Sequence, residues 1–153
     1  MKKKIQSWKL LLGLALLILW LLIFPKKIPH SGFPQICYKS TCYNLEIANT
    51  PALREKWLMN RDFLGENSWM IFIFEKDDIH KFWMKDTIIP LDMIRLNSWF
   101  QVVYIANAIP CKQEICPIYS PNNLARYVLE IAWWQASKIW LKIWEKMTKQ
   151  WSR

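Results

Sequence analysis

Residues 82–92 hold the densest group of side chains that could do chemistry in this chain. A lysine beside an aspartate can serve as a general acid and base if a pocket desolvates the pair. Lys85, Asp86 and Asp92 could supply such a pair. The competing interpretation is a surface ion pair between Lys85 and Asp86, with Asp92 capping a turn, and charged pairs in turns are usually structural. The pattern therefore favours a structural role of these charges over catalysis.

Aromatic and hydroxyl side chains in the same stretch suit a ligand cleft. Trp83 and Met84 could form its floor, because aromatic rings bind sugars and other amphipathic ligands. The alternative is that both are ordinary core residues. Tyr119 and Arg126 are expected to converge on the polar group. The candidate ligand-binding residues are Trp83, Lys85, Asp86, Thr87, Asp92 and Glu130.

Metal and cofactor motifs are missing from the sequence. His30 and His80 lie fifty residues apart, with no metal-ligand spacing around either. The sequence also has no glycine-rich phosphate loop, nucleophile elbow or HExxH motif. We therefore expect neither a metal nor a cofactor.

Four cysteines form two pairs of equal spacing. Four residues separate Cys37 from Cys42, and four separate Cys111 from Cys116. Pairing is the default in an exported protein, and each local pair would close a short hairpin or loop. Cross-pairing, free thiols and a four-thiolate zinc site are the alternatives, because the sequence cannot choose among connectivities and a spacing of four is tolerable for zinc.

The first 27 residues have the pattern of a targeting or anchoring segment. A basic start precedes a fifteen-residue apolar run, residues 10–24, which Pro25 and two lysines close. The run could be the core of a cleaved secretory signal, but no small-x-small cleavage site follows it. Lysines at its ends could snorkel and extend it towards the roughly 20 residues of a membrane span. We favour an uncleaved signal anchor that crosses the membrane through residues 5–24, with the domain outside the cytoplasm.

The formal net charge of +9 is concentrated at the start of the chain. Six lysines flank the first apolar run, and from residue 28 onward 15 basic residues oppose 12 acidic ones. An excess of three is ordinary for a protein surface, and no compact basic patch interleaved with aromatic residues stands out. Nucleic acid is therefore not an expected partner. The hydrophobic content of 53% also excludes wholesale disorder.

Residues 28–35 are expected to form an extended linker ahead of one domain, residues 36–153. Within that domain, residues 36–48 predict a hairpin. Thr50-Pro51 predicts a helix start with Thr50 as N-cap, and the helix should end near residue 58. Strands are expected at residues 70–74, 80–85, 91–96, 101–108 and 126–131.

An extended segment over residues 82–87 would fix which side chains lie together. Successive side chains of a strand point to opposite faces. The odd-numbered residues 83–87 should therefore share one face, and the even-numbered residues 82–86 the other. Asp86 would then face the side opposite to Lys85 and Thr87.

Residues 132–151 have the periodicity of an amphipathic helix. Apolar residues recur there at spacings of three and four, with lysines and a glutamate between them. Such a helix would pack on the sheet or lie on a membrane surface.

Eleven consecutive residues, 82–92, follow one signature, FWMKDTIIPLD. Across residues 43–145 the chain resembles the family catalogued as domain of unknown function 192. That family more often has Asn at the position of Asp86. The resemblance implies a small, mostly β barrel or sandwich, often exported, with no assigned reaction. Further matching pieces stand in order at residues 45–50, 58–59, 70–72, 102–103, 110–111, 116–119 and 125–130.

The resemblance also bears on the tryptophans, of which the chain has 11 against only 3 glycines. Our hypothesis is that six of their codons are UGA, read as glycine in the source lineage and written here as tryptophan. The alternative is genuine tryptophan enriching a membrane interface. With glycine, the C-terminal helix would break into a short helix at residues 135–139, a strand at residues 141–143 and a turn at residue 144. The family has glycine where this chain has Trp57, Trp69, Trp99, Trp134, Trp140 and Trp144.

The sequence thus predicts a mainly β domain with one or two short helices behind an N-terminal hydrophobic helix. We expect a ligand-binding or accessory module, with a small ligand or an envelope component as partner. A small hydrolase or lyase that uses Lys85 with Asp86 or Asp92 is the alternative. A third class, a purely structural envelope protein, predicts no cleft around residues 82–92.

Overall fold

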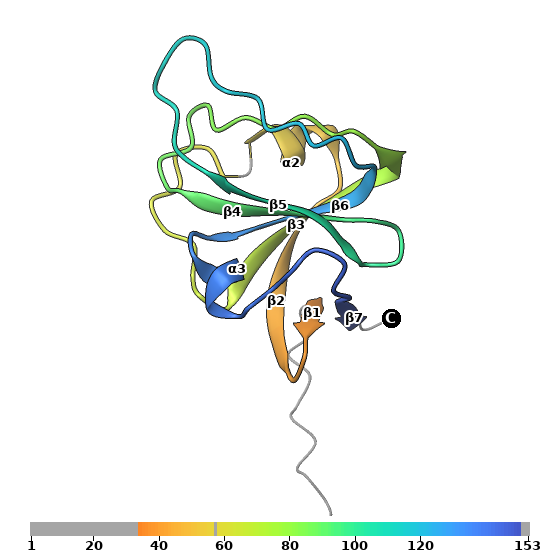
Figure 1. The fold of residues 1–153 in the computed structure, drawn as a ribbon. Coiled ribbons are helices and arrows are strands. Elements are labelled where there is room, and N and C mark those ends of the chain that lie inside the picture. Colours follow the sequence, from red (N-terminus) through yellow and green to blue (C-terminus); the bar gives the residue numbers. More distant parts are fainter. Residues whose placement is uncertain (1–33, 57, 151–153) are drawn as a thin grey trace, which may run out of the picture. The chain divides into compact units, whose positions relative to one another are not determined.

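The computed structural model describes residues 34–56 and 58–150. They form one seven-stranded sheet of order β5-β4-β6-β3-β2-β1-β7, in which β2 and β3 pair in parallel and the other neighbours are antiparallel (Figure 1). The elements are β1 (Gln35–Tyr38), β2 (Thr41–Ala48), α2 (Pro51–Lys56), β3 (Ser68–Asp78), β4 (Leu91–Leu96), β5 (Val102–Ala108), β6 (Ala125–Ala132), α3 (Gln135–Lys138) and β7 (Thr148–Gln150).

The membrane anchor predicted for residues 5–24 lies outside the described residues. Within residues 34–56 and 58–150, no helix has the length and apolar character needed to cross a bilayer. The mainly β class with two short helices is confirmed.

The sheet curls so that its two edges approach each other. Gln101, just before the edge strand β5, forms a bridge with Lys146, just before the opposite edge strand β7. Backbone N–H groups of Trp144 and Met147 donate to the carbonyls of Val102 and Phe100 at 2.7 and 2.9 Å. The result is a half-closed barrel, not a sandwich of two sheets.

Local sequence explains the first elements. The hairpin predicted for residues 36–48 is confirmed as β1 and β2 around a turn at Lys39 and Ser40. Thr50 is the predicted N-cap of α2, and its hydroxyl oxygen accepts a 3.3 Å hydrogen bond from the N–H of Leu53.

Each face of the sheet has its own apolar core. One contains Trp69, Ile71, Leu129 and Ile131 and is closed by residues from α3 onward. The other is covered by α2 and by the loops at residues 79–90 and 109–124, which Figure 1 shows on the side of the sheet opposite to α3. This second core matters here, because it borders the candidate site.

The long amphipathic helix predicted over residues 132–151 is wrong. The segment holds the short helix α3, turns at residues 139–140 and 143–144, and the strand β7. A short helix after residue 134 and a turn at residue 144 match the expectation for glycine at these positions, but the strand expected at residues 141–143 lies later, at β7. Most of the apolar residues that gave this periodicity are exposed, namely Trp133, Trp134, Trp140, Ile143 and Trp144, so they do not form one buried face.

Residues 82–87 form an extended segment with isolated bridges instead of a regular strand. The predicted alternation of side chains between two faces holds from Phe82 to Lys85. It fails at the next residue, because Asp86 has a left-handed backbone with φ of 56°. Asp86 is therefore exposed and Thr87 is buried. The N–H of Thr87 closes this turn by donating to the carbonyl of Met84 at 3.2 Å.

Both cysteine pairs are local disulfides. Cys37–Cys42 joins β1 to β2 across the hairpin, and Cys111–Cys116 closes a loop over the second core. The N–H of Cys111 also donates to the carbonyl of Met84 at 3.2 Å. The second disulfide thereby stabilises the loop that supports residues 82–87.

Three of the tryptophans proposed to be recoded have backbones that favour glycine. Trp134, Trp140 and Trp144 are exposed and have φ values of 66°, 58° and 75°. A non-glycine residue in this region costs roughly 1–2 kcal/mol. The backbone therefore supports the glycine hypothesis at these positions.

The other described positions differ. Trp69 has no left-handed backbone, is fully buried against Tyr43, and donates its Nε1–H to Gln135 Oε1 at 2.9 Å. In the turn after β4 the left-handed residue is Phe100, next to the exposed Trp99. The structure gives the glycine hypothesis no support at positions 69 and 99, and Trp57 lies outside the described residues.

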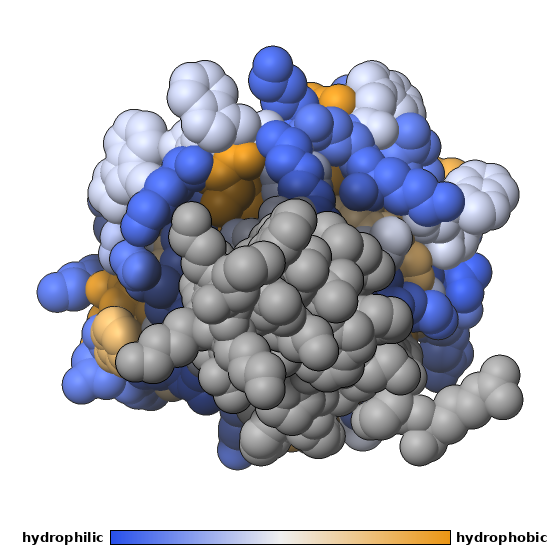
Figure 2. All heavy atoms as spheres, turned by 90° about the horizontal axis from the view of Figure 1, so that it is seen from below, coloured by the Kyte–Doolittle hydropathy of each residue, from blue (hydrophilic) through white to orange (hydrophobic). Residues whose placement is uncertain are grey.

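The face of the molecule seen from below carries mainly hydrophilic residues where it is visible, with hydrophobic residues scattered between them (Figure 2). Scattered apolar residues are normal on protein surfaces. The visible part of this face therefore does not identify a docking surface.

Candidate ligand-binding site

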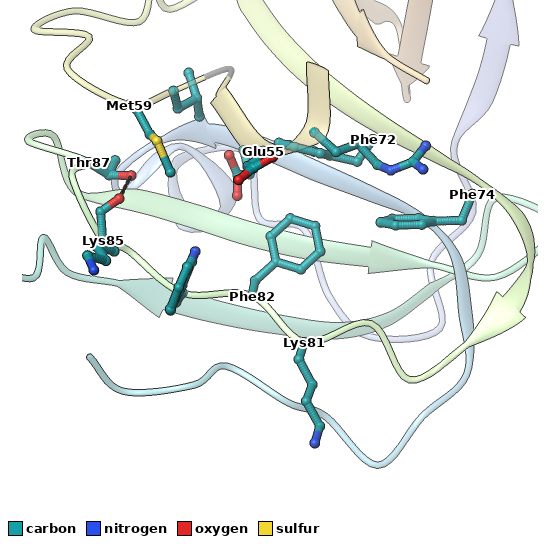
Figure 3. A pocket seen from close by; sticks show the side chains of 12 residues that line it. Glu55, Met59, Phe72, Phe74, Lys81, Phe82, Lys85 and Thr87 are labelled. Carbon is teal, nitrogen blue, oxygen red and sulfur yellow. Dashed lines mark hydrogen bonds between the residues drawn. The ribbon is translucent and has the colours of Figure 1, made fainter. Parts of the chain in front are cut away.

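A cavity of about 260 Å³ lies between α2, β3 and the segment at residues 81–87 (Figure 3). Its size is just below the range of about 300–1,000 Å³ that is usual for small-molecule sites. Half of its lining residues are apolar and half are polar. The lining residues are Arg54, Glu55, Leu58, Met59, Phe72, Phe74, Lys81, Phe82, Trp83, Lys85, Thr87 and Glu130.

Aromatic rings form two walls that meet at Phe82. The ring of Phe82 meets Phe72 edge to face, with 5.1 Å between centroids and 83° between planes. It meets Phe74 similarly, at 6.2 Å and 74°. Figure 3 shows Phe82 between Glu55 and Lys81, with Phe74 to one side. Trp83 stands at the mouth with 53% of its surface exposed, so an aromatic face is available to a ligand.

Glu130 is the polar group at the buried end of the cavity. Glu130 lies in β6, and its register partners in the two neighbouring strands are Met70 of β3 and Met93 of β4. Both methionines are fully buried. Only 4% of Glu130 is exposed. Burial among these apolar neighbours raises the pKa of its carboxyl to about 8, against the smaller opposing effect of the charge on Arg95. No hydrogen bond to this carboxyl occurs within the described part of the chain.

Arg95 lies behind the aromatic wall. Its guanidinium carbon is 4.7 Å from the centroid of Phe82, and Nη2 donates to the carbonyl of Tyr119 at 3.0 Å. The side chain is fully buried, and its Nε and Nη1 have no hydrogen-bond partner among the described residues. Burial lowers the pKa of Arg95 to about 10, opposed mainly by the carboxylate of Glu130. The site therefore holds an acid and a base that desolvation drives towards neutrality.

Two of the three cations that line the cavity, Arg54 and Lys85, contact other groups of the protein. Arg54 Nη1 donates to the carbonyls of Asn49 and Ile73 at 2.9 Å each, and its guanidinium stacks over Phe74 at 4.9 Å. Lys85 Nζ lies 5.7 Å from the centroid of the Trp83 ring. Arg54 is thus held in place, whereas Lys85 and the third lining cation, Lys81, are exposed to solvent.

Four of the six predicted ligand-binding residues line the cavity, namely Trp83, Lys85, Thr87 and Glu130. Asp86 and Asp92 do not line it. Asp86 is turned to solvent by its left-handed backbone. Asp92 is fully buried, accepts hydrogen bonds from Asn107 Nδ2 at 2.6 Å and from the N–H of Ala136 at 2.9 Å, and thus fixes the start of α3.

The expected convergence of Tyr119 and Arg126 on this group is met only in part. Tyr119 pairs with Phe82 in an isolated bridge, and its hydroxyl accepts from the N–H of Ile109 at 3.1 Å. Arg126 instead forms an ion pair with Asp77 at 3.5 Å. Tyr119 therefore supports the cavity wall, and Arg126 belongs to a different contact.

Arg54, Arg95 and the phenylalanine walls were not predicted from the sequence. Arg95 carried a usable signal, because it interrupts an apolar strand just as Glu130 does. A charged residue in a strand buried on both faces must find a partner or a cavity. The phenylalanines gave no signal that separates a cavity wall from ordinary core.

Within residues 34–56 and 58–150, no group of three His, Cys, Asp or Glu side chains is arranged to hold a metal.

Comparison with known proteins gives the chain a family. The model of a family described as uncharacterized, domain of unknown function 192, matches residues 35–148. The chain belongs to this family. The predicted resemblance is confirmed, and the match runs from the start of β1 to the first residue of β7 and includes every residue that lines the cavity. No curated protein matches the chain.

Two solved structures are similar to this member of the domain-of-unknown-function-192 family. One, from Sinorhizobium meliloti 1021, is described as a candidate transcription regulator and has 26% identity and a TM-score of 0.68, covering 76% of this chain and 91% of its own. The other, from Novosphingobium aromaticivorans DSM 12444, is a protein of unknown function with 31% identity and a TM-score of 0.67, covering 79% and 89%.

Proposed function

We propose that this chain is a membrane-anchored, extracytoplasmic binding module whose small amphipathic ligand occupies the cavity above Glu130. One observation carries the proposal: Glu130, of which only 4% is exposed, lines a cavity, and its carboxyl has no protein hydrogen-bond partner among the described residues. A buried polar group without a partner costs free energy, and function is a common reason to retain one. The aromatic walls supply the apolar contact that such ligands need.

A hydrolase or lyase that combines Lys85 with Asp86 or Asp92 is not favoured by this geometry. Asp92 lies on the opposite face of β4 from the cavity, because Leu91 and Met93 belong to the cavity-side core and Asp92 bonds to α3. A role in transcription is not proposed, because the excess of basic residues from residue 28 onward is only three.

A ligand screen by thermal shift on the full chain in mild detergent tests the proposal. Trp83→Ala removes an exposed ring at the mouth, and Trp99→Ala removes a more exposed ring in the turn before β5, outside the cavity lining. We expect hits whose stabilisation is lost in Trp83→Ala and kept in Trp99→Ala. A screen with no hit, or hits that both variants retain, would contradict the binding function.

A further inference from the structure

The chemistry of the cavity narrows the class of ligand, an inference that rests on the binding function proposed above. Charges of both signs line it: Arg54, Lys81 and Lys85 carry positive charge, and Glu55 is a carboxylate at its mouth. The positive groups do not gather around one point. Lys81 extends away from Phe82, whereas Glu55 lies on the other side of that ring (Figure 3). Because the lining side chains carry both signs of charge, the cavity selects neither anions nor cations.

Two of the cations that line the cavity already contact other groups of the protein. Arg54 is committed to two backbone carbonyls and to the face of Phe74. Lys85 lies against the ring of Trp83. An anion that paired with Arg54 would have to displace its contacts, while a neutral ligand would leave them in place and could add hydrogen bonds to the exposed Lys81 and Lys85.

The polar and apolar groups occur together at short range. Glu130 and Thr87, whose hydroxyl donates a long hydrogen bond of 3.5 Å to the carbonyl of Lys85, line the same cavity as Phe72 and Phe82. A ligand that satisfies all of them needs an apolar face and several hydroxyl groups at its edge. A pyranose ring has this form, because its axial C–H groups make an apolar face and its equatorial hydroxyls both donate and accept. A cavity of about 260 Å³ limits the buried part to a single small ring.

We propose that the cavity binds one ring of an uncharged sugar, with its C–H face on Phe82 or Trp83 and its hydroxyls on Glu130 and Thr87. Glu130 suits this ligand in either protonation state, because a carboxylate accepts from a hydroxyl and a carboxylic acid can also donate to one. The sugar can be a free monosaccharide or the end of an envelope glycan, since both present the same ring.

Saturation-transfer NMR on the full chain in mild detergent tests this inference. The probes are glucose, methyl β-glucoside and methyl N-acetyl-β-glucosaminide, with cyclohexanol and benzoate as a neutral and an anionic comparison. Transfer to the methyl glycosides alone would indicate a glycan end, and transfer to glucose as well would indicate a free sugar. We expect transfer to ring protons of at least one sugar and no comparable transfer to benzoate.

Variants locate the binding. Glu130→Met keeps the size of the side chain between its methionine neighbours and removes the carboxyl, and Thr87→Val removes the hydroxyl with little change of shape. We expect Glu130→Met to weaken sugar binding about tenfold, as for a lost hydrogen bond to a buried group. Glu114→Gln, an exposed residue outside the cavity lining, should leave binding unchanged.

The outcomes separate this inference from the binding function itself. If cyclohexanol or benzoate binds better than every sugar and depends on Glu130, the cavity is a ligand site but the sugar inference is wrong. If sugars bind equally well to Glu130→Met and Thr87→Val, they bind elsewhere and the inference is also wrong. If no probe binds and the wider screen has no hit, both proposals fail.

Discussion

Arg95 and Glu130 lie diagonally across the neighbouring strands β4 and β6, and no direct ion pair joins them. Arg95 is the register partner of Val128, and Glu130 is that of Met93, so both side chains point to the cavity-side face. Instead of closing on Glu130, the guanidinium of Arg95 packs on Phe82 and bonds to the carbonyl of Tyr119. The carboxyl is thereby left open to the cavity. This separation is the physical basis of the proposed site.

The first prediction concerns the stability of the fold against pH. The carboxyl of Glu130 has a pKa near 4.5 when unfolded and about 8 in the fold. Between these values the folded chain holds a proton that the unfolded chain has lost. Stability from this group is therefore fully present below the unfolded pKa and falls by up to about 1.4 kcal/mol for each pH unit towards pH 8.

Glu130→Gln should remove this slope and make the protein more stable than the parent at pH 8, with the difference vanishing near pH 5. Urea unfolding across that pH range measures it, with Glu114→Gln as the control. A variant that is less stable than the parent at pH 8 would show that an ionised Glu130 pairs with Arg95 in the native state.

The second prediction concerns the charge on Arg95. Its positive charge lowers the pKa of Glu130, so Arg95→Gln should raise that pKa further, whereas Arg95→Lys should leave it closer to the parent value. Carbon-13 NMR titration of the Glu130 carboxyl measures this pKa in both variants. An unchanged pKa in Arg95→Gln would mean that the two groups do not interact.

The third prediction concerns the left-handed tryptophans. Replacing Trp134, Trp140 or Trp144 by glycine should stabilise the fold by about 1 kcal/mol each, because glycine enters this backbone region without strain. The same change at Trp99, which has no left-handed backbone, should be neutral or destabilising. Loss of stability in all four variants would contradict the strain argument.

Peptide masses from the source organism test the recoding hypothesis itself. We expect glycine at positions 134, 140 and 144, where the backbone is left-handed. Tryptophan at those three positions in the native protein would reject recoding. Position 69 is informative separately, because the structure encloses an indole there.

The fourth prediction concerns the disulfide Cys111–Cys116. Closing so short a loop contributes about 2 kcal/mol in the chain-entropy account, so replacing both cysteines by serine should lower stability by that amount. The variant should also bind ligand more weakly, because Cys111 supports Met84 and hence the cavity wall. Replacing Cys37 and Cys42 instead should lower stability without weakening binding, since that pair lies in the hairpin. If the loss of either disulfide weakened ligand binding equally, Cys111–Cys116 would have no specific role in supporting the cavity wall.

The fifth prediction concerns location. If residues 5–24 anchor the chain with its domain outside the cytoplasm, protease added to spheroplasts should digest the domain. A cytoplasmic marker enzyme should survive the same treatment. Protection of the domain until the membrane is lysed would contradict the proposed orientation.

Much of the sheet could be predicted because its strands are apolar runs separated by clear turns, as in β4 and β6. The failures have local causes. Periodicity at residues 132–151 indicated a helix, but left-handed residues at 134, 140 and 144 interrupt it. The face of Thr87 was assigned wrongly for the same reason, since one left-handed residue, Asp86, reverses the alternation.

The candidate site could be predicted only in part. Glu130 was visible as an acid in an apolar strand, and Trp83, Lys85 and Thr87 were visible through the signature. Contacts between distant segments were not visible. The approach of α2 to residues 81–87, which creates the cavity, depends on how loops cross the sheet and has no counterpart in spacing or composition.

Crystals of the full chain soaked with a library of small fragments test the central claim most directly. The account predicts that bound fragments gather in one place, in contact with Phe82 and within hydrogen-bond distance of the carboxyl of Glu130. Fragments that bind only elsewhere, with Phe82 and Glu130 untouched at every concentration, would contradict it.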